Sequence, residues 1–273
     1  MENMNIFIHE DYKNEERSKI KKNRLIGVGL FALALLFSLA SFTPDTALLT
    51  FLSWPVLIVG FLIWAPANAA DTRLKSAPNI DSFINDELRG LNNKYSLHHH
   101  PRVGNVWISE LMITPSGLIV FDANGALGPV SCKAGAKGDI WKAPSNLMDR
   151  LTGARPQIGN PTVELDAMMA AAHELLASIG KPDVPVKGIA LFTRNPDITL
   201  DGCSYGAAPL NEMRDAVRDL EVDMGADREE GLVVNTILTS EDRKRLNNLL
   251  APVSIPASSV AEKPAKSAVS RRS

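Results

Sequence analysis

The residues best suited to metal chemistry are three adjacent histidines, His98-His99-His100, which stand directly before Pro101. Metal ligands usually converge from separate elements, so three neighbours in one run favour a solvated loop over a metal site. The two cysteines, Cys132 and Cys203, lie far apart in the chain and belong to no partner motif. We therefore expect a reducing compartment and no cysteine zinc site.

The composition narrows the function classes further. The formal net charge of −2 does not mark the whole chain as a nucleic-acid binder. No Gly-x-x-x-x-Gly-Lys loop is present, which argues against a P-loop nucleotide-binding protein. We also do not expect a serine hydrolase. Any chemistry must therefore come from acids and bases that the fold brings together.

Two apolar runs near the N-terminus are the strongest structural signal in the sequence. Residues 25–42 and 47–65 contain no Lys, Arg, Asp or Glu, and only residues 43–46 separate them. Each run is close to the roughly 20 residues that a helix needs to cross a bilayer. A single secretory signal would have one shorter apolar core. We therefore predict a transmembrane helical hairpin at residues 25–66.

The distribution of basic residues predicts how this hairpin is oriented. Residues 1–24 form a basic leader, Arg73 and Lys75 follow the second run, and the loop between the runs carries only Asp45. The positive-inside rule then places both termini in the cytoplasm of a multi-pass protein of the cell (inner) membrane. Residues 251–273 are poor in large apolar side chains, and we expect a disordered tail there.

Residues 71–250 are long enough for one soluble domain. Apolar spacing predicts helices at residues 80–94, 162–179, 209–220 and 240–250, and strands at residues 106–114, 118–122, 129–132 and 184–192. A tight turn at residues 115–117 pairs the first two strands as an antiparallel hairpin. The order of elements predicts an α/β or α+β domain with a mixed sheet flanked by helices.

This order of elements resembles the nuclease-related domain (NERD) family, a branch of the PD-(D/E)xK nuclease-like fold. The resemblance covers about residues 80–220 and is carried by Glu87 in the early helix, the turn glycine Gly117, Trp141 and the Asn160-Pro161 pair. It implies that acids on two adjacent strands hold Mg²⁺ or Mn²⁺ at a scissile phosphate, where the metal lowers the pKa of a bound water. It also implies a lysine two residues after the second acid, on the same strand face.

The sequence departs from the family at the residues that carry this chemistry. Ser109 stands where the first acid is expected, and Asn124 stands where the lysine is expected, so only Asp122 and Glu87 remain as catalytic candidates. Asp122, Glu87 and Glu110 are the candidate metal ligands, although Glu110 should point to the opposite face of its strand unless a bulge re-aims it. Hard cations need several carboxylates, so we expect no resident cofactor, and Mg²⁺ or Mn²⁺ only if the domain is active.

A basic stretch between strand and helix could contact phosphates in such a fold, or form an ordinary charged loop. Its members are Lys133, Lys137, Lys142, Arg150 and Arg155. The sequence thus favours a membrane-anchored, catalytically inactive nuclease-related domain that binds DNA or a partner protein at the cytoplasmic face. The alternatives are a metal-dependent DNA endonuclease that uses Asp122 with Glu87 and Glu110, and a structural membrane assembly protein. The sequence does not define the oligomeric state.

Overall fold

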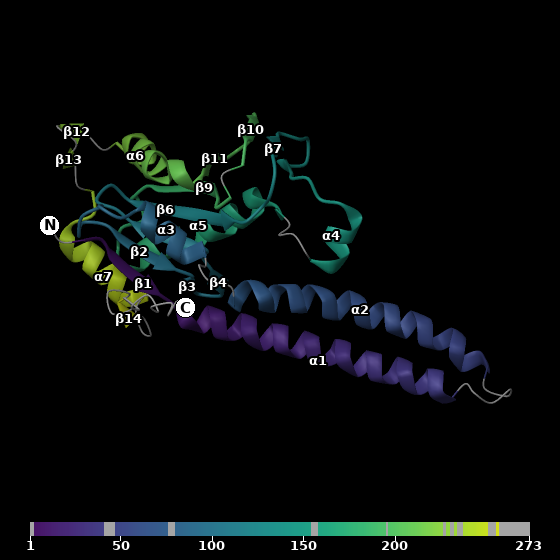
Figure 1. The fold of residues 1–273 in the computed structure, drawn as a ribbon. Helices are drawn as coiled ribbons and strands as arrows, with labels where there is room; N and C mark the ends of the chain where they lie inside the picture. Colours follow the sequence, from purple (N-terminus) through teal and green to yellow (C-terminus); the bar gives the residue numbers. More distant parts are fainter. Residues whose placement is uncertain are drawn as a thin grey trace, which may run out of the picture.

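The computed structural model describes residues 3–40, 47–75, 80–153, 158–194, 196–225, 228–229, 232–233, 237–250 and 255–256. A long antiparallel helical hairpin projects from a mixed α/β domain (Figure 1). The hairpin is formed by α1 (Glu10–Ala40) and α2 (Ala47–Lys75). The predicted fold class is confirmed at this level, because a mixed sheet with helices accompanies two long apolar helices.

Close packing of small residues holds the hairpin together. Both helices are long and apolar enough to cross a membrane, and their outward faces expose large apolar side chains. A Cβ added at Gly27 would lie only 2.6 Å from Cβ of Trp64, so the two backbones approach as closely as glycine allows. Nη1 of Arg24 lies 2.8 Å from Oδ2 of Asp71, and this ion pair joins the two helices on the domain side of the apolar runs.

The domain is built on a seven-stranded mixed sheet. Its strands in spatial order are β11 (Gly206–Pro209), β9 (Val186–Phe192), β6 (Leu118–Asn124), β5 (Glu110–Ile113), β2 (Ser96–His99), β1 (Asn5–Ile8) and β14 (Ile255–Pro256). The β5–β6 pair is antiparallel, as predicted, while β6 pairs with β9 in parallel. Gly117 makes the β5–β6 turn because any Cβ there would lie 2.3 Å from the carbonyl oxygen of Pro185.

Helices cover both faces of this sheet. The first face packs against α5 (Pro161–Ser178) and α7 (Ser240–Leu250), both of which match their predicted positions within a few residues. The second face packs against α3 (Ile80–Glu87) and α6 (Met213–Asp223), which follows the short 3₁₀ helix η2 (Leu210–Glu212). The helix α3 is shorter than predicted, and Gly90 adopts a positive φ of 101° shortly after its end.

Smaller elements lie around this core. A three-stranded sheet contains β10 (Ile198–Asp201), β7 (Val130–Lys133) and β8 (Ile140–Lys142), followed by the short helix α4 (Leu147–Thr152). Two short ribbons are β3 (Arg102–Val103) with β4 (Val106–Trp107), and β12 (Arg228–Glu229) with β13 (Leu232–Val233). The strand predicted at residues 106–114 is therefore divided between β4 and β5.

The N-terminal leader is part of the domain and not only a flank of the hairpin. Residues of β1 pair in parallel with β2, from Asn5 opposite Ser96 to Ile8 opposite His99. The domain boundary expected at residue 71 therefore leaves out one strand of the sheet. In the expected tail, Ile255 and Pro256 pair with β1, and residues 251–254 and 257–273 lie outside the described part of the chain.

The histidine run does not form a solvated loop, and that prediction is wrong. His98 and His99 are 0% exposed in β2, where they lie on opposite faces of the sheet. Nε2 of His98 lies 2.8 Å from Oδ1 of Asn247, and Nε2 of His99 lies 2.8 Å from Oδ1 of Asn85. Polar partners from helices on each face therefore make burial of the two imidazoles possible.

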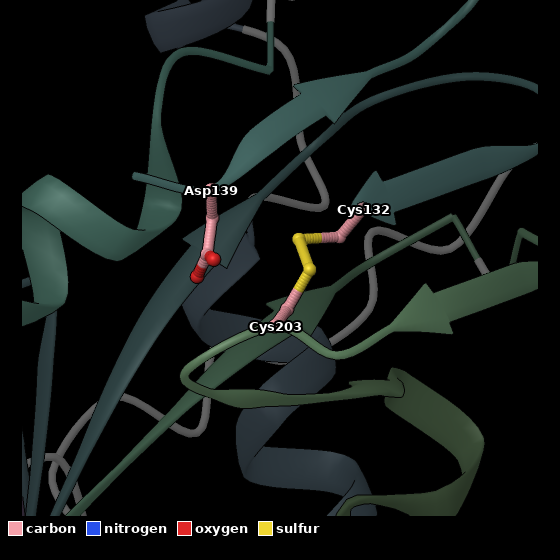
Figure 2. Close-up of side chains that lie close together, drawn as sticks. All are labelled: Cys132, Asp139 and Cys203. Atoms are coloured by element: carbon pink, nitrogen blue, oxygen red, sulfur yellow. A yellow bond between two sulfur atoms is a disulfide. The ribbon is translucent and has the colours of Figure 1, made fainter. Parts of the chain in front are cut away.

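The two cysteines are joined, contrary to the expectation that they lack a partner. Cys132 in β7 and Cys203 after β10 form a disulfide across 71 residues, with their Cα atoms 6.3 Å apart (Figure 2). The parallel pairing of β7 with β10 places them side by side. Disulfides are typical of oxidising compartments, so this pairing conflicts with the compartment that the cysteine content indicated.

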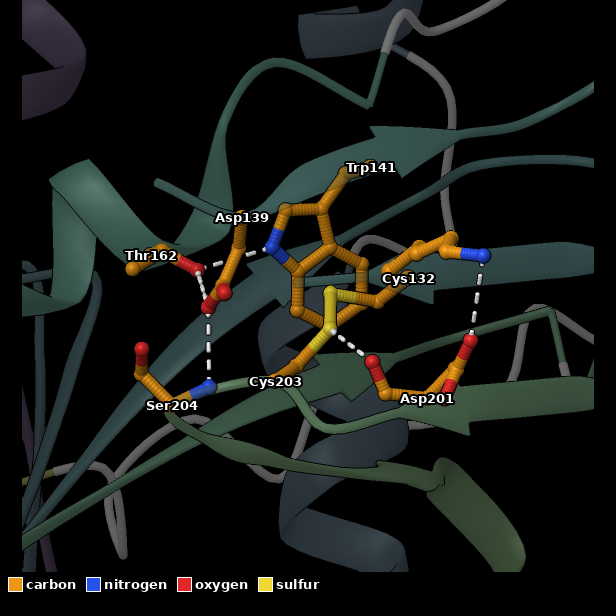
Figure 3. The surroundings of a disulfide bond; sticks show 8 residues. Cys132, Asp139, Trp141, Thr162, Asp201, Cys203 and Ser204 are labelled. Atoms are coloured by element: carbon orange, nitrogen blue, oxygen red, sulfur yellow. Dashed lines mark hydrogen bonds and ion pairs between the residues drawn. A yellow bond between two sulfur atoms is a disulfide. The ribbon is translucent and has the colours of Figure 1, made fainter. Parts of the chain in front are cut away.

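A polar network lies next to this disulfide (Figure 3). Oδ2 of Asp139 accepts hydrogen bonds from Oγ1 of Thr162 at 2.8 Å and from the backbone N–H of Ser204 at 2.9 Å. Nε1–H of Trp141 donates to Oγ1 of Thr162 at 2.9 Å. The network ties the small sheet to the start of α5, and this start forms one wall of the candidate site.

Candidate functional site

A cavity of about 690 Å³ opens where the beginning of α1 meets the domain. Its walls come from α1, the first turn of α3, the segment from β4 to β5, the end of β6 and the first turns of α5. The polar and charged side chains that line it are Tyr12, Lys13, Arg17, Asp81, His100, Trp107, Ser109, Asp122, Glu164, Thr193 and Arg194. Ser109 and Asp122, expected to form a nuclease-like site, thus lie beside residues from the beginning of α1.

The structure places Ser109 and Asp122 together, as the sequence predicts. Oγ of Ser109, directly before β5, accepts a hydrogen bond from the backbone N–H of Ala123 in β6 at 3.2 Å, so Ser109 lies beside the end of β6. Both residues line the cavity. The hydroxyl of Ser109 is thus held by the backbone at the position where the family has its first acid.

The carboxyl group of Asp122 has an acidic neighbour that strand reasoning did not place there. Glu164 lies in the first turn of α5 and reaches Asp122 within hydrogen-bonding distance. Burial raises the pKa of Asp122 to about 7, and the charge of Glu164 adds to the rise. Asp122 is only 5% exposed, and its Oδ2 has no hydrogen-bond partner among the described residues. The carboxyl group of Asp122 therefore titrates near neutral pH.

Asn124 has a structural role at the position where the family has its lysine. Its Nδ2 donates to the carbonyl oxygen of Ile158 at 2.8 Å, and its Oδ1 accepts from the backbone N–H of Ala126 at 2.9 Å. Both ends of the amide therefore stabilise the chain that leaves β6. No positive charge replaces the lysine at this position of the strand.

The other two candidate acids lie away from Asp122. Glu110 is 0% exposed and shares its sheet face with Met112, whereas Asp122 shares the opposite face with Val120. The expectation that Glu110 points away from the site is therefore confirmed. Glu87 is the last residue of α3, about 9 Å of helix rise from the cavity-lining Asp81 in the first turn.

Asp81 belongs to a cluster of ionisable groups that the sequence pattern did not reveal. Nζ of Lys13 lies 2.6 Å from Oδ2 of Asp81, and Nε2 of His100 lies 3.5 Å from Oδ1. Burial alone would raise the pKa of Asp81, but His100 and Lys13 hold it well below its usual value. His100 also adopts a positive φ of 54°, a strained conformation for a residue with a side chain.

A second ion pair lies behind this cluster. Nδ1 of His99 lies 2.6 Å from Oε2 of Glu110, and both side chains are fully buried. Burial would lower the pKa of His99, but Glu110 raises it above its usual value. Asp81, His100 and Glu110 offer ligand atoms within 4.8 Å of one another. Because Lys13 already neutralises Asp81, and His99 pairs with Glu110, this group is charge-balanced without a metal ion.

The basic stretch singled out from the sequence does not line the cavity. Lys133, Lys137 and Lys142 are exposed on or beside the small sheet, and Lys133 lies 3.5 Å from Asp201. Arg150 lies in α4, and Arg155 is outside the described residues. Lys13, Arg17 and Arg194 supply the positive charge at the cavity instead, with Tyr12, Phe83 and Trp107 as its aromatic residues.

The turn between β10 and β11 carries a sequence that matches a serine-hydrolase motif. Residues 202–206 read Gly-Cys-Ser-Tyr-Gly and so match Gly-x-Ser-x-Gly, although we expect no serine hydrolase. The nucleophile elbow of that class lies between a strand and a helix. Here Ser204 lies between β10 and β11, and its backbone N–H is bound to Asp139. The match is therefore a turn between two strands and not an elbow.

No family model matches this chain, and no curated protein or solved structure matches it. The resemblance to the nuclease-related domain family therefore rests on the residues quoted above.

Proposed function

We propose that the hairpin anchors this protein in the cell (inner) membrane with both termini in the cytoplasm. Two observations support the proposal: the apolar outer faces of α1 and α2, and the concentration of basic residues on the domain side of both helices. The ion pair between Arg24 and Asp71 lies where the apolar runs end, as expected of the boundary between hydrocarbon and water. The domain would then sit directly above the bilayer surface.

We propose further that the domain binds single-stranded nucleic acid at the cavity without cleaving it. The observation that carries this proposal is the engagement of Asn124, whose amide is bound at both ends by the backbone. In the related nucleases a lysine at this position would orient the attacking water or stabilise charge on the phosphate. With serine in place of the first acid as well, the strands offer one carboxylate and no ammonium group.

The lining of the cavity supports nucleic acid over a protein segment. Arg17 and Arg194 offer cations that can contact phosphates. Tyr12 and Trp107 line the cavity with aromatic rings; Tyr12 stacks on His100 with centroids 4.3 Å apart, and Arg102 lies 5.3 Å from the Trp107 centroid, so a base would stack on the remaining face of each ring. Protonation of Asp122 near neutral pH removes one negative charge from the cavity, which favours an anionic ligand.

Fluorescence anisotropy of a labelled single-stranded oligonucleotide with the full chain in detergent tests this proposal. Binding should weaken with salt, and Arg194→Gln should reduce the slope of log K against log salt by about 1. Trp107→Ala should weaken binding by roughly 5- to 150-fold if a base stacks on the ring. Lys244→Gln changes an exposed charge on α7, away from the cavity, and should bind as the parent does. Equal binding by all four chains would refute the cavity as the binding site.

A metal-dependent nuclease is the second candidate, and the contact between Asp122 and Glu164 favours it. Two neighbouring carboxyl groups could hold a divalent cation between them. In that case Glu164 would supply the acid that position 109 lacks, and Glu87 and Glu110 would have no part. Calorimetric titration of the full chain with Mn²⁺, repeated on Glu164→Gln, separates the two candidates. Stoichiometric uptake that is lost in the variant would favour the nuclease.

A further inference from the structure

The short helix α4 exposes large apolar side chains that the domain does not use. Leu147, Met148 and Leu151 are 69%, 61% and 37% exposed. Their spacing of i, i+1 and i+4 places them within one face of the helix. No residue of α4 belongs to either apolar core of the described chain. An apolar face of this kind is unfavourable in water and calls for an apolar partner.

The fold holds α4 against the hairpin. Its N-terminus is fixed by a capping box in which Oδ1 of Asn146 accepts from the backbone N–H of Asp149 at 2.6 Å. Its C-cap Gly153 has a positive φ of 63°, and a Cβ there would lie 3.1 Å from Cα of Pro66 in α2. Figure 1 shows α4 beside α2, apart from the helices that cover the sheet. The helix is therefore placed by contact with the hairpin.

The position of this contact along α2 indicates what covers the apolar face of α4. Pro66 directly follows the charge-free run that ends at residue 65, and Gly153 packs against Pro66 and Ala69. In the proposed anchor this level is the headgroup region of the bilayer, between the hydrocarbon and the ion pair of Arg24 with Asp71. The apolar face of α4 thus lies at the level where the apolar run of α2 ends.

We propose that α4 is a membrane-contact helix, with Leu147, Met148 and Leu151 inserted at the border of the headgroups and acyl chains. The partner is the phospholipid surface itself, and the inference rests on the proposed membrane anchor. Exposed Lys142, shortly before α4, fits such a position, because basic residues beside an interfacial helix favour anionic lipid. This contact would give the domain a third attachment to the membrane, besides α1 and α2.

Depth-dependent quenching in liposomes tests this proposal with the full chain. A Met148→Cys chain, purified without reductant and labelled with an NBD maleimide, is reconstituted in phosphatidylcholine and phosphatidylglycerol. The quencher is a nitroxide placed either near the glycerol end or near the methyl end of an acyl chain. The parent chain, oxidised to its Cys132–Cys203 disulfide before labelling, is the labelling blank. Leu57→Cys in α2 reports the anchor, and Asp219→Cys on the exposed surface of α6 reports the aqueous side.

The proposal predicts that the probe at position 148 loses most of its fluorescence to the shallow quencher and little to the deep one. Position 57 should show the reverse, and position 219 should lose little to either. Adding Leu151→Glu to the chain labelled at position 148 should abolish the shallow quenching, whereas adding Ser145→Glu, an exposed control just before α4, should not. Quenching at position 57 without quenching at position 148 would overturn the inference and leave the anchor in place. Absence of quenching at both positions would overturn both.

Discussion

The buried carboxyl group of Asp122 gives the most specific quantitative prediction. Its pKa rises from 3.8 to about 7 on folding, mainly because of burial and further because of Glu164. Between these two values the folded chain binds a proton that the unfolded chain has released, so stability falls as the pH rises. The full penalty is about 4 kcal/mol above pH 7, since one pKa unit corresponds to 1.36 kcal/mol.

Asp122→Asn removes this titration and keeps the shape of the side chain. At pH 8 the variant should be more stable than the parent by up to about 4 kcal/mol, or on the order of 10 °C in Tm for a domain of this size. Near pH 4 the two chains should unfold at the same temperature, apart from the change in hydrogen bonding to Glu164. Thermal unfolding of the full chain in detergent, followed from pH 4 to pH 8, measures both values.

Asp183→Asn is the matched control, because Asp183 is exposed in the loop before β9. It should leave the pH dependence unchanged. The reasoning fails if the parent and Asp122→Asn lose the same stability between pH 4 and pH 8. In that case Asp122 would be ionised throughout the range.

Three further predictions concern the hairpin, the ion pair at the cavity and the disulfide. Gly27→Leu forces a side chain against Trp64 and should cost roughly 1–3 kcal/mol in a detergent melt followed by circular dichroism, whereas Gly29→Leu, where a Cβ meets nothing within 4 Å, should not. Lys13→Met leaves buried Asp81 with only His100 as its ion-pair partner and should cost up to about 3–5 kcal/mol in a urea titration, with most of the loss recovered by adding Asp81→Asn. Rapid alkylation of intact cells should trap Cys132 and Cys203 as free thiols, because the proposed orientation places the domain in the reducing cytoplasm. Complete oxidation of the two cysteines would place the domain on the other side of the membrane.

The sequence predicted the elements that depend on local pattern. The helix α5 begins at Asn160-Pro161 and ends before Gly180, and α7 spans its predicted residues, because caps and apolar spacing are local signals. The β5–β6 hairpin followed from the turn at Gly117 in the same way. These elements also placed Ser109 and Asp122 side by side.

Contacts between distant segments could not be read in this way. The strand β1 lies in a stretch that resembled a leader, and it becomes a strand only by pairing with β2 about 90 residues later along the chain. His98 and His99 looked solvated because their partners, Asn247 and Asn85, come from separate helices. The disulfide joins cysteines 71 residues apart, which spacing alone cannot pair.

Part of the candidate site was within reach of the sequence. Glu164 lies three residues after Pro161, in the Asn160-Pro161 motif region that the sequence already singled out. The positions of Lys13 and Arg17 at the cavity could not be predicted from the sequence, because they depend on how α1 meets the domain. The site is therefore formed by the beginning of α1 together with the sheet and α5.

The most direct test of the account is incubation of the full chain with a labelled oligonucleotide in Mg²⁺ or Mn²⁺. The bound fraction is measured first, and the same sample is then run on a denaturing gel. We expect the oligonucleotide to be bound and to remain intact in both metals. Shortened products made by the parent and absent with Asp122→Asn would contradict the account.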